Sequence, residues 1–311
     1  MDAVVTWVDG NDPVHRERKK ARKESLLNMP DKEATADVRF LSNDEIRYCL
    51  RSIYNYAPWI DRVFLVTDRQ YPDSINKYVA EKHGIYQIDH SEIFSGYKSY
   101  LPTFSSRSIE TMMPNIQGLS ESFMHICDDY FFTGRVDRDF FYSLNGLPKV
   151  YGTLKEIPTE IDSLYVHHLV NAAKLISPDA KYYIWPEHYM KPLSKRVLRQ
   201  IMQDHGDKYF ANASYPFRDK NQFKPTVAVQ NYLHSHENVK VRKMSKFFSL
   251  EISEGAGKKK LKYYRTKKYL LENNFIKVCC INDWANAETK MPGIIKCLKN
   301  ATGPMAPFEY S

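Results

Sequence analysis

Residues 2–13 have the sequence DAVVTWVDGNDP, in which a short apolar strand runs directly into a turn. The run of β-branched and apolar residues predicts the strand, and the Asp, Gly, Asn and Pro that follow predict the turn. In α/β proteins, ligands bind just beyond the carboxyl ends of strands. Asp9 and Asp12 are therefore candidates to meet a nucleotide or a metal ion, unless their side chains only cap their own backbone. Trp7 could stack on a base, although a Trp in a first strand is more often part of the core.

Strand and helix patterns alternate further along the chain. The sequence SNDE at residues 42–45 predicts a capping box that begins a helix ending near Tyr56. Apolar runs at residues 62–67, 86–88 and 123–127 predict strands, and an acidic residue follows each of them. Strands that alternate with helices in this way indicate an α/β protein with a mostly parallel sheet.

The 311 residues suffice for one large domain with a substantial insertion. We expect residues 1–136 to form the first part of the α/β core. Residues 137–240 have a more helical pattern and predict an inserted helical part or second lobe. Residues 241–311 are expected to hold a basic segment, a last core strand near residues 275–281 and the C-terminal tail.

The amino-acid composition is typical of a globular protein, and its positive net charge favours binding to an anionic partner. Hydrophobic residues make up 43% of the chain and charged residues 26%, and the formal net charge is +8. No stretch approaches the ~20 apolar residues of a membrane span, and the first residues lack a basic-then-apolar signal pattern. The five cysteines are odd in number and without CxxC spacing, which predicts a reducing compartment and argues against structural zinc. We therefore expect a cytoplasmic location.

Two adjacent carboxylates, Asp128 and Asp129, follow the predicted buried strand at residues 123–127. They repel each other unless a cation lies between them, and Mg²⁺ or Mn²⁺ commonly joins carboxylates to substrate phosphates. The alternative is that one side chain caps a turn and the other is solvated. Asp283 follows the last predicted strand and is a further candidate ligand, against the alternative of a plain Asn-Asp turn.

Arg47 and Arg51 lie four residues apart on a predicted helix and so share one face. Two adjacent guanidinium groups are unfavourable unless an anion joins them, and a diphosphate would serve because Arg binds phosphate in a bidentate manner. The alternative is pairing with Asp44 and other acidic side chains.

His188 lies in a loop bounded by prolines, WPEHYMKP at residues 185–192, just before a predicted helix. A histidine held there is a candidate general base, since its pKa is ordinarily near neutral. The alternative is a surface histidine.

A basic run extends from Lys258 to Lys268, interleaved with Tyr263 and Tyr264. Such a run predicts contact with nucleic acid, anionic lipid or a charged polysaccharide, and a merely solvated loop is the alternative.

Several of these motifs together resemble the four conserved regions of the Stealth proteins. The matching segments are residues 2–13 for the first region; residues 43–48, 50–53, 57–59, 101–106, 109–110 and 118–129 for the second; residues 188–192 and, more loosely, Arg218 for the third; and residues 280–283 for the fourth. Stealth proteins are hexose-1-phosphate transferases of bacterial capsule and cell-surface polysaccharide synthesis, with a eukaryotic relative that modifies lysosomal enzymes. The chain lacks the large inserts of that relative, which favours the bacterial role.

The resemblance implies a GT-A-like, Rossmann-type core that binds a nucleotide sugar, with an inserted helical part. It implies transfer of a hexose-1-phosphate from a UDP-hexose to a glycan hydroxyl, with release of UMP. The family's catalytic set falls on Glu110, Asp129, His188 and Arg218. Mg²⁺ or Mn²⁺ would be held by Asp129 with Asp128 or Asp283. Donor contacts are expected from Thr6, Trp7, Val8, Asp9, Gly10, Asp12, Arg47, Arg51, Ser105, Ser106 and Asp128.

Two other functions compete with this one. An ordinary glycosyltransferase would use the same donor and metal site but release UDP. A non-catalytic protein would bind an anionic polymer or the inner membrane face through the basic run from Lys258 to Lys268. We expect no nucleic-acid partner.

Overall fold

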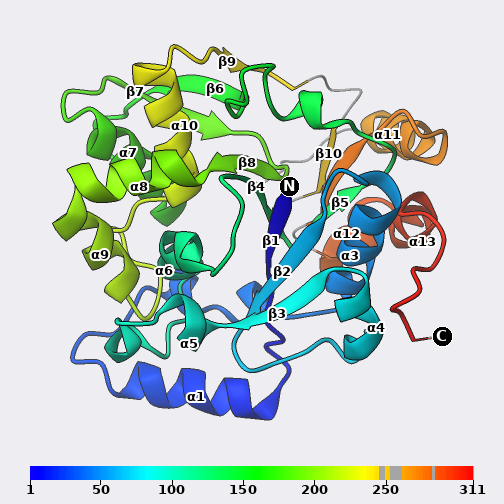
Figure 1. Ribbon diagram of the computed structural model, residues 1–311, viewed down its shortest axis with the longest axis horizontal. Helices are drawn as coiled ribbons and strands as arrows, with labels where there is room; N and C mark the ends of the chain where they lie inside the picture. The colour runs from blue at the N-terminus through cyan, green and yellow to red at the C-terminus, as the bar shows by residue number, and fades with distance from the viewer. Residues whose placement is uncertain (245–248, 253–260, 282–283, 311) are drawn as a thin grey trace.

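The computed structural model describes residues 1–244, 249–252, 261–281 and 284–310 (Figure 1). A five-stranded sheet with the order β3-β2-β1-β4-β8 forms its centre. Its strands are β1 (Asp2–Thr6), β2 (Arg62–Thr67), β3 (Ile85–Asp89), β4 (Ser122–Cys127) and β8 (Lys191–Ser194). The first four strands are mutually parallel, and β8 pairs antiparallel with β4. The prediction of an α/β fold with a mostly parallel sheet is confirmed.

Strand β1 is buried on both faces because its alternate side chains enter two different cores. Ala3 and Val5 belong to one hydrophobic cluster, and Val4 belongs to another on the opposite face. A strand whose neighbours extend apolar side chains to both faces requires a continuous apolar run rather than alternation. This requirement explains the sequence AVV between Asp2 and Thr6.

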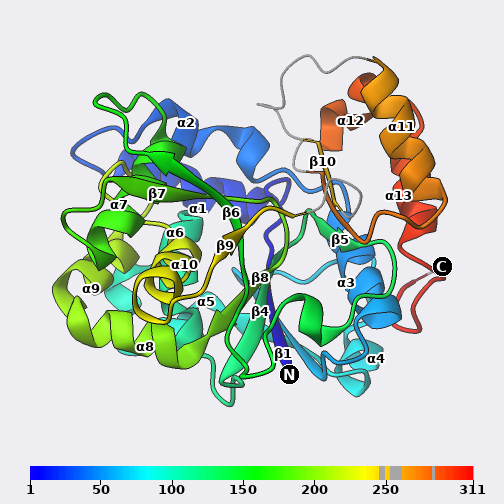
Figure 2. The same ribbon diagram turned by 90° about the horizontal axis from the view of Figure 1, so that it is seen from above.

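Helices cover both faces of the sheet, as the view from above shows (Figure 2). One face carries α6 (Ser106–Met112), α7 (Leu164–Ile176), α8 (Lys195–Asp204), α9 (Gly206–Ser214) and α10 (Pro225–His236). The other carries α3 (Glu45–Tyr56), α4 (Lys77–Lys82), α11 (Leu261–Glu272), α12 (Trp284–Lys290) and α13 (Ile294–Ala301). Three further helices are α1 (Pro13–Glu24), α2 (Lys32–Thr35) and α5 (His90–Ile93).

The predicted capping box at the start of α3 is wrong. The N-cap is Asp44, which adopts a left-handed conformation with φ of 65° and makes no side-chain capping hydrogen bond. The side chain of Glu45 accepts instead from the backbone nitrogen of Asn43. The helix itself ends at Tyr56, as predicted.

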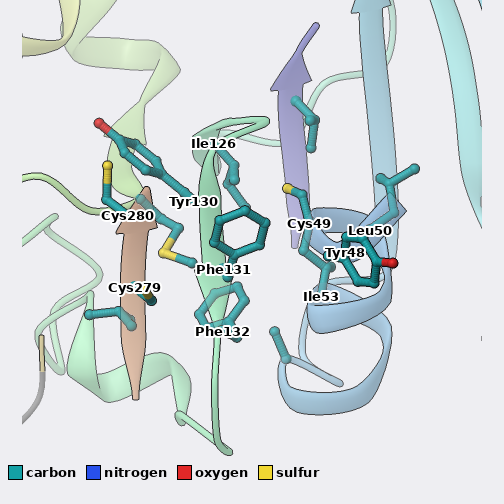
Figure 3. Packing of buried hydrophobic residues seen from close by; sticks show 14 of the residues in the cluster. Tyr48, Cys49, Leu50, Ile53, Ile126, Tyr130, Phe131, Phe132, Cys279 and Cys280 are labelled. Carbon is teal, nitrogen blue, oxygen red and sulfur yellow. The ribbon is translucent and has the colours of Figure 1, made fainter. Parts of the chain in front are cut away.

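The predicted last core strand lies outside the central sheet. β11 (Val278–Ile281) pairs with β10 (Ser249–Ile252) and with β5 (Tyr130–Phe132) in a separate three-stranded sheet. Phe131 and Phe132 of β5 lie between β11 and helix α3 (Figure 3). The last strand therefore belongs to the core through packing rather than through pairing with the parallel strands.

Residues 137–240 are not structurally separate from the preceding segment. Their strand β8 completes the central sheet, and helices α7 to α10 share a hydrophobic cluster with Val4 and Phe64 of that sheet. The segment also contributes β6 (Val150–Glu156) and β7 (Tyr182–Pro186) to a third sheet with β9 (Val241–Arg242). Within the described ranges, no helix has both the length and the apolar character needed to cross a membrane.

Candidate active site

A cavity of about 980 Å³ opens at the carboxyl edge of the parallel strands. Trp7 follows β1, His90 follows β3 and Asp128 follows β4, and all three line the cavity. This edge is where the chain leaves each parallel strand, so side chains from distant parts of the sequence meet there. The position agrees with the location predicted for ligand binding.

The four residues implied to be catalytic all line this one cavity. Glu110 comes from α6, Asp129 from the turn after β4, His188 from the loop between β7 and β8, and Arg218 from the loop between α9 and α10. Four separate elements thus bring together side chains that are up to about a hundred residues apart. Their roles remain predictions, but the fold places all four side chains at one cavity, as those roles require.

Glu110 is a buried carboxylate at the cavity wall, and one of its oxygens has no hydrogen-bond partner. Arg107 Nη1 donates to its Oε1 at 2.5 Å, while Oε2 has no hydrogen-bond partner. Burial would raise the pKa of Glu110, but the positive charges of Arg107 and Lys224 hold it below its ordinary value. Glu110 is therefore ionised and able to accept a hydrogen bond from a ligand.

Asp128 and Asp129 form an acidic side of the cavity, together with the buried Glu45. Burial raises the pKa of Asp129 to about 6, and burial with the charge of Asp129 raises the pKa of Asp128 well above its ordinary value. Cys280 Sγ donates weakly to Asp129 Oδ2 at 3.7 Å. A cation bound to these two neighbouring carboxylates would relieve the repulsion between them.

This donor set fits a magnesium or manganese ion. Mg²⁺ prefers oxygen ligands and is usually held by one or two carboxylates together with substrate phosphates. The part of the chain that the structure describes contains no group of three or more His, Cys, Asp or Glu arranged to hold a metal by itself. Asp283, the third predicted ligand, lies outside the described residues.

Arg218 is anchored at the cavity wall by α6. Its Nη2 donates to Ser106 Oγ at 2.9 Å, and Arg107 Nη1 approaches the same oxygen at 3.4 Å. Burial, followed by the charge of Arg107, lowers the pKa of Arg218 to about 9. Ser106, a predicted donor contact, therefore lies in the cavity as the acceptor that orients Arg218.

His188 stands beside two aromatic side chains at the cavity. The ring of Tyr165 lies 6.4 Å from that of His188, and it packs edge-on against Trp185 at 5.8 Å. All three residues line the cavity. His188 is therefore not an isolated surface histidine, which was the alternative to its catalytic role.

Two further histidines enter the cavity wall in a neutral form. Burial lowers the pKa of His125 to about 4 and that of His168 to about 2. His168 Nδ1 lies 3.3 Å from the Arg107 Nε that donates to it, and its Nε2 lies 2.9 Å from the Asp219 carbonyl oxygen. His168 thus positions Arg107.

Lys191 and Lys224 are cavity residues that the sequence did not indicate as functional. Lys191 begins β8 and pairs with His125 of β4, while Lys224 is the N-cap of α10. The one available signal was that Lys191 falls within the motif that contains His188. Nothing local marked Lys224, because its place in the cavity depends on how α10 packs.

Asp9, Gly10 and Asp12, which were predicted to contact the donor, do not line the cavity. They stabilise the turn that follows the first strand. Asp9 Oδ1 accepts from Asn11 N at 2.8 Å, and Asp12 Oδ1 accepts from Val14 N at 2.7 Å, so both side chains cap local backbone. A Cβ on Gly10 would stand 2.4 Å from the Phe40 carbonyl oxygen, so this close approach requires glycine. Thr6, Trp7 and Val8 do line the cavity.

Ser105 is also outside the cavity lining. It is fully buried, and its Oγ donates to Gln222 Oε1 at 2.8 Å. Its role in the structure is to join α6 to the loop before α10.

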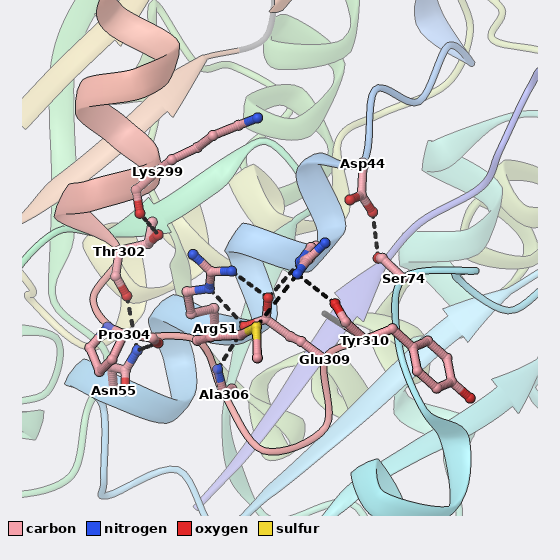
Figure 4. Close-up of polar contacts among 12 residues, drawn as sticks. Asp44, Arg51, Asn55, Ser74, Lys299, Thr302, Pro304, Ala306, Glu309 and Tyr310 are labelled. Carbon is pink, nitrogen blue, oxygen red and sulfur yellow. Dashed lines mark hydrogen bonds and ion pairs between the residues drawn. The ribbon is translucent and has the colours of Figure 1, made fainter.

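Arg47 and Arg51, which were predicted to bind the donor diphosphate, do not line the cavity, and an internal carboxylate pairs with both of them. Arg47 Nε donates to Glu309 Oε2 at 2.6 Å, and Arg51 Nε donates to Glu309 Oε1 at 2.7 Å (Figure 4). Arg47 Nη2 also donates to the Tyr310 carbonyl oxygen at 2.7 Å. The alternative of pairing with acidic side chains is correct, although the partner is Glu309 rather than Asp44.

The basic run is only partly described. Lys258, Lys259 and Lys260 lie outside the described residues, and helix α11 begins at Leu261. Lys267 is buried, and Lys268 Nζ donates to the Pro292 carbonyl oxygen at 3.0 Å. At least these two lysines therefore contribute to packing within the protein.

Two family models match the chain. Residues 1–27 match Stealth protein CR1, conserved region 1, and residues 39–150 match Stealth protein CR2, conserved region 2. The chain belongs to the Stealth family. The Stealth matches include Glu110 and Asp129, whereas His188 and Arg218 lie beyond them, so the assignment of these two residues to a third region remains a prediction.

Curated relatives bear polysaccharide phosphotransferase names. The exopolysaccharide phosphotransferase SCO2592 of Streptomyces coelicolor is 33% identical over 245 residues, which are 76% of this chain and 25% of the relative. SCO6021 of the same organism, also named an exopolysaccharide phosphotransferase, is 39% identical over 75% of this chain and 43% of its own. The receptor polysaccharide phosphotransferase WefC of Streptococcus gordonii is 36% identical over 51% of this chain and 46% of its own. The Stealth chain described here thus spans less than half the length of each.

Two solved glycosyltransferase structures show a more distant likeness to this Stealth chain. The galactosyltransferase LgtC, in complex with donor and acceptor sugar analogues, has a TM-score of 0.47 and 10% identity over 99% of this chain and 98% of its own. Mouse xyloside xylosyltransferase 1 has a TM-score of 0.41 and 11% identity over 90% of this chain and 96% of its own.

Proposed function

We propose that this cavity transfers a hexose-1-phosphate from a UDP-hexose to a hydroxyl of a glycan, in the synthesis of a cell-surface polysaccharide. The observation that carries the proposal is the meeting of Glu110, Asp129, His188 and Arg218 in one cavity with an acidic side and a basic side. Membership of the Stealth family and the names of the relatives support the same class of reaction.

The reaction forms one bond to phosphorus and breaks another. The acceptor oxygen attacks the β-phosphorus of the donor, and the bond from that phosphorus to the bridging oxygen breaks, so that UMP leaves. The hexose keeps its β-phosphate, and the product is a phosphodiester. Phosphoryl transfer of this kind depends mainly on positioning and on electrostatic stabilisation of the phosphoryl oxygens.

His188 is the proposed general base, and it takes the proton of the acceptor hydroxyl. Glu110, with its unpartnered Oε2, orients the acceptor or His188 by accepting a hydrogen bond. Arg218, held by Ser106, stabilises negative charge on the phosphoryl oxygens and on the leaving UMP. These roles use the ionisation states that the surroundings favour, since Glu110 is held ionised and an arginine keeps its charge.

Asp128 and Asp129 are the residues that would hold Mg²⁺ or Mn²⁺. When bound, such an ion neutralises charge on the donor phosphates. The two carboxylates would thus act on the donor phosphates through the metal ion, whereas the basic residues would act on them directly.

The test is the identity of the nucleotide released. Purified protein is incubated with Mg²⁺, a panel of UDP-hexoses and a short glycan acceptor, and the nucleotide products are separated by chromatography. UMP supports the proposal and names the donor. UDP would instead establish an ordinary glycosyltransferase.

A further inference from the structure

The N-terminus of helix α10 lies at the cavity without a side-chain cap. Lys224, the N-cap, makes no side-chain capping hydrogen bond, and Thr226 is fully buried with no hydrogen-bond partner at Oγ1. Both residues line the cavity. A helix N-terminus carries a partial positive charge and exposed backbone donors, which together attract phosphate. A buried hydroxyl without a partner marks a place where a ligand supplies one.

Lys191 brings a second ammonium group to the same cavity. Lys191 is 3% exposed, and its Nζ donates to the Glu187 carbonyl oxygen and lies 3.8 Å from the centre of the Tyr189 ring. Since β8 runs antiparallel to β4, the first residue of β8 is placed at the carboxyl edge of the sheet, near Asp128.

Neither lysine forms an ion pair with a described carboxylate, although the charge of Glu110 acts on Lys224 at longer range. Among the acidic side chains that the structure describes, none has a carboxylate oxygen within 4.0 Å of Nζ of Lys191 or Lys224. An enclosed ammonium group without a counter-ion is unfavourable for folding. Burial accordingly lowers the pKa of Lys224 to about 8 and that of Lys191 well below its ordinary value. Cations retained at such a cost, facing a cavity, indicate a site for an anionic ligand.

The paired arginines on α3 are not available for this purpose, because Glu309 holds both Arg47 and Arg51. The basic side of the cavity therefore includes Lys191, Lys224 and Arg218, while Arg107 is paired to Glu110 and Arg39 to Glu33.

We propose that Lys191, Lys224 and Thr226 bind the diphosphate of the nucleotide-sugar donor at the N-terminus of α10. That the ligand is a nucleotide-sugar donor rests on the proposed function. That the ligand is an anion rests only on the residues that line the cavity. Lys191 and Lys224 contribute charge, and Thr226 Oγ1 donates a hydrogen bond to a phosphate oxygen.

Binding without turnover tests the assignment. Titration calorimetry measures the affinity for UDP and for inorganic pyrophosphate, each with Mg²⁺ and with chelator, in the wild type and in Lys191→Met, Lys224→Met and Thr226→Val. We expect each lysine variant to bind both anions about 10- to 100-fold more weakly, the range of a hydrogen bond to a charged group. Thr226→Val should lose about 3- to 10-fold, the range of a neutral hydrogen bond. Lys220→Met, an exposed lysine four residues before Lys224, is the matched control and should bind as the wild type does.

Thermal stability separates binding from a structural role. Lys191 is buried, Lys224 is partly buried, and neither forms an ion pair with a described acidic residue. Replacing either lysine by Met should therefore leave the melting temperature equal or higher while the affinity falls. Lys224→Arg should restore binding to within about threefold, since it keeps the charge. A lower melting temperature in both Met variants, or unchanged affinity in both, would overturn the proposal.

The remaining outcomes distinguish this inference from the proposed function. If both lysine variants lose UDP while the wild type releases no UMP from any donor, the diphosphate site stands and the proposed reaction fails. If the wild type releases UMP and the variants keep full affinity for UDP, the reaction stands and this site fails. If a glycan phosphodiester binds through the lysines more tightly than UDP, the site belongs to the acceptor and the assignment is wrong.

Discussion

Arg51 and Glu309 form a two-pronged ion pair that joins helix α3 to the C-terminal segment across 258 positions of sequence. The carboxylate of Glu309 is fully buried, and Arg47 donates to it as well. A backbone hydrogen bond from Tyr310 to Ser74 holds the next residue of the same segment. The C-terminal segment is thereby fixed to the outer surface of α3.

Glu309→Gln should destabilise the protein without altering nucleotide binding. The substitution leaves two enclosed guanidinium groups without a full counter-charge, a loss of about 3 kcal/mol and several degrees in melting temperature. Glu17→Gln, at an exposed position of α1, is the control and should leave the melting temperature unchanged. The measurement is thermal denaturation with UDP affinity alongside. Unchanged stability with altered UDP affinity would return Arg47 and Arg51 to the role that the sequence first suggested.

His90 should make stability depend on pH between about 6.5 and 4. Burial lowers its pKa to about 4, against the opposing charges of Asp68 and Asp89, and His15 and Arg18 lower it further. The unfolded chain takes up the proton near 6.5 and the folded protein does not, so the stabilisation is complete above pH 6.5 and is lost as the pH falls towards 4.

The matching variant removes the titrating ring. His90→Gln should reduce the slope of unfolding free energy against pH by up to about 1.4 kcal/mol per pH unit in that window, one proton's worth. The exposed His236→Gln should keep the wild-type slope. Denaturant unfolding at a series of pH values measures both, and an unchanged slope in His90→Gln would contradict the prediction.

His188→Ala and Asp129→Ala should each lower turnover by at least ~100-fold, the effect of removing a general base or an electrostatic group. The measurement is nucleotide release by folded variants under saturating donor. Lys155 is exposed and lies over the Trp185 ring, so Lys155→Met is a control for indirect disturbance near His188. Near-normal turnover in either alanine variant would remove that residue from the mechanism.

Mg²⁺ should stabilise the wild type and should not stabilise Asp129→Asn. A ligand that binds only the folded state raises the melting temperature with concentration, and Asp129 is a proposed ligand. Asp129→Asn should also melt higher than the wild type in chelator, because it relieves the repulsion between neighbouring carboxylates. Equal magnesium shifts in the two proteins, or turnover that survives chelation, would show that the acidic pair does not hold the metal.

Local sequence patterns predicted the central sheet well because they reflect local requirements. Residues 62–67 form β2 with the bounds that the apolar run suggested, and the carboxylates at strand ends lie at the predicted edge. A parallel strand that is buried on both faces needs a continuous run of apolar residues, and this run is visible in the strand's own sequence.

The partners of charged side chains were not predictable in the same way. The spacing of Arg47 and Arg51 required an anion but did not identify it, and the anion proved to be Glu309 from the far end of the chain. Lys191 reaches the cavity only because β8 returns antiparallel beside β4, which no local pattern indicates. Contacts between distant parts of the chain therefore determine which cationic side chains lie at the cavity.

The most direct test of the central claim follows the β-phosphorus of the donor. UDP-hexose labelled with ³²P at the β-phosphate is incubated with the protein, Mg²⁺ and a glycan acceptor, and the label is traced. Transfer of hexose-1-phosphate predicts that the label enters the glycan and that the released nucleotide is unlabelled UMP. Label recovered in UDP, with an unlabelled glycan product, would contradict the account.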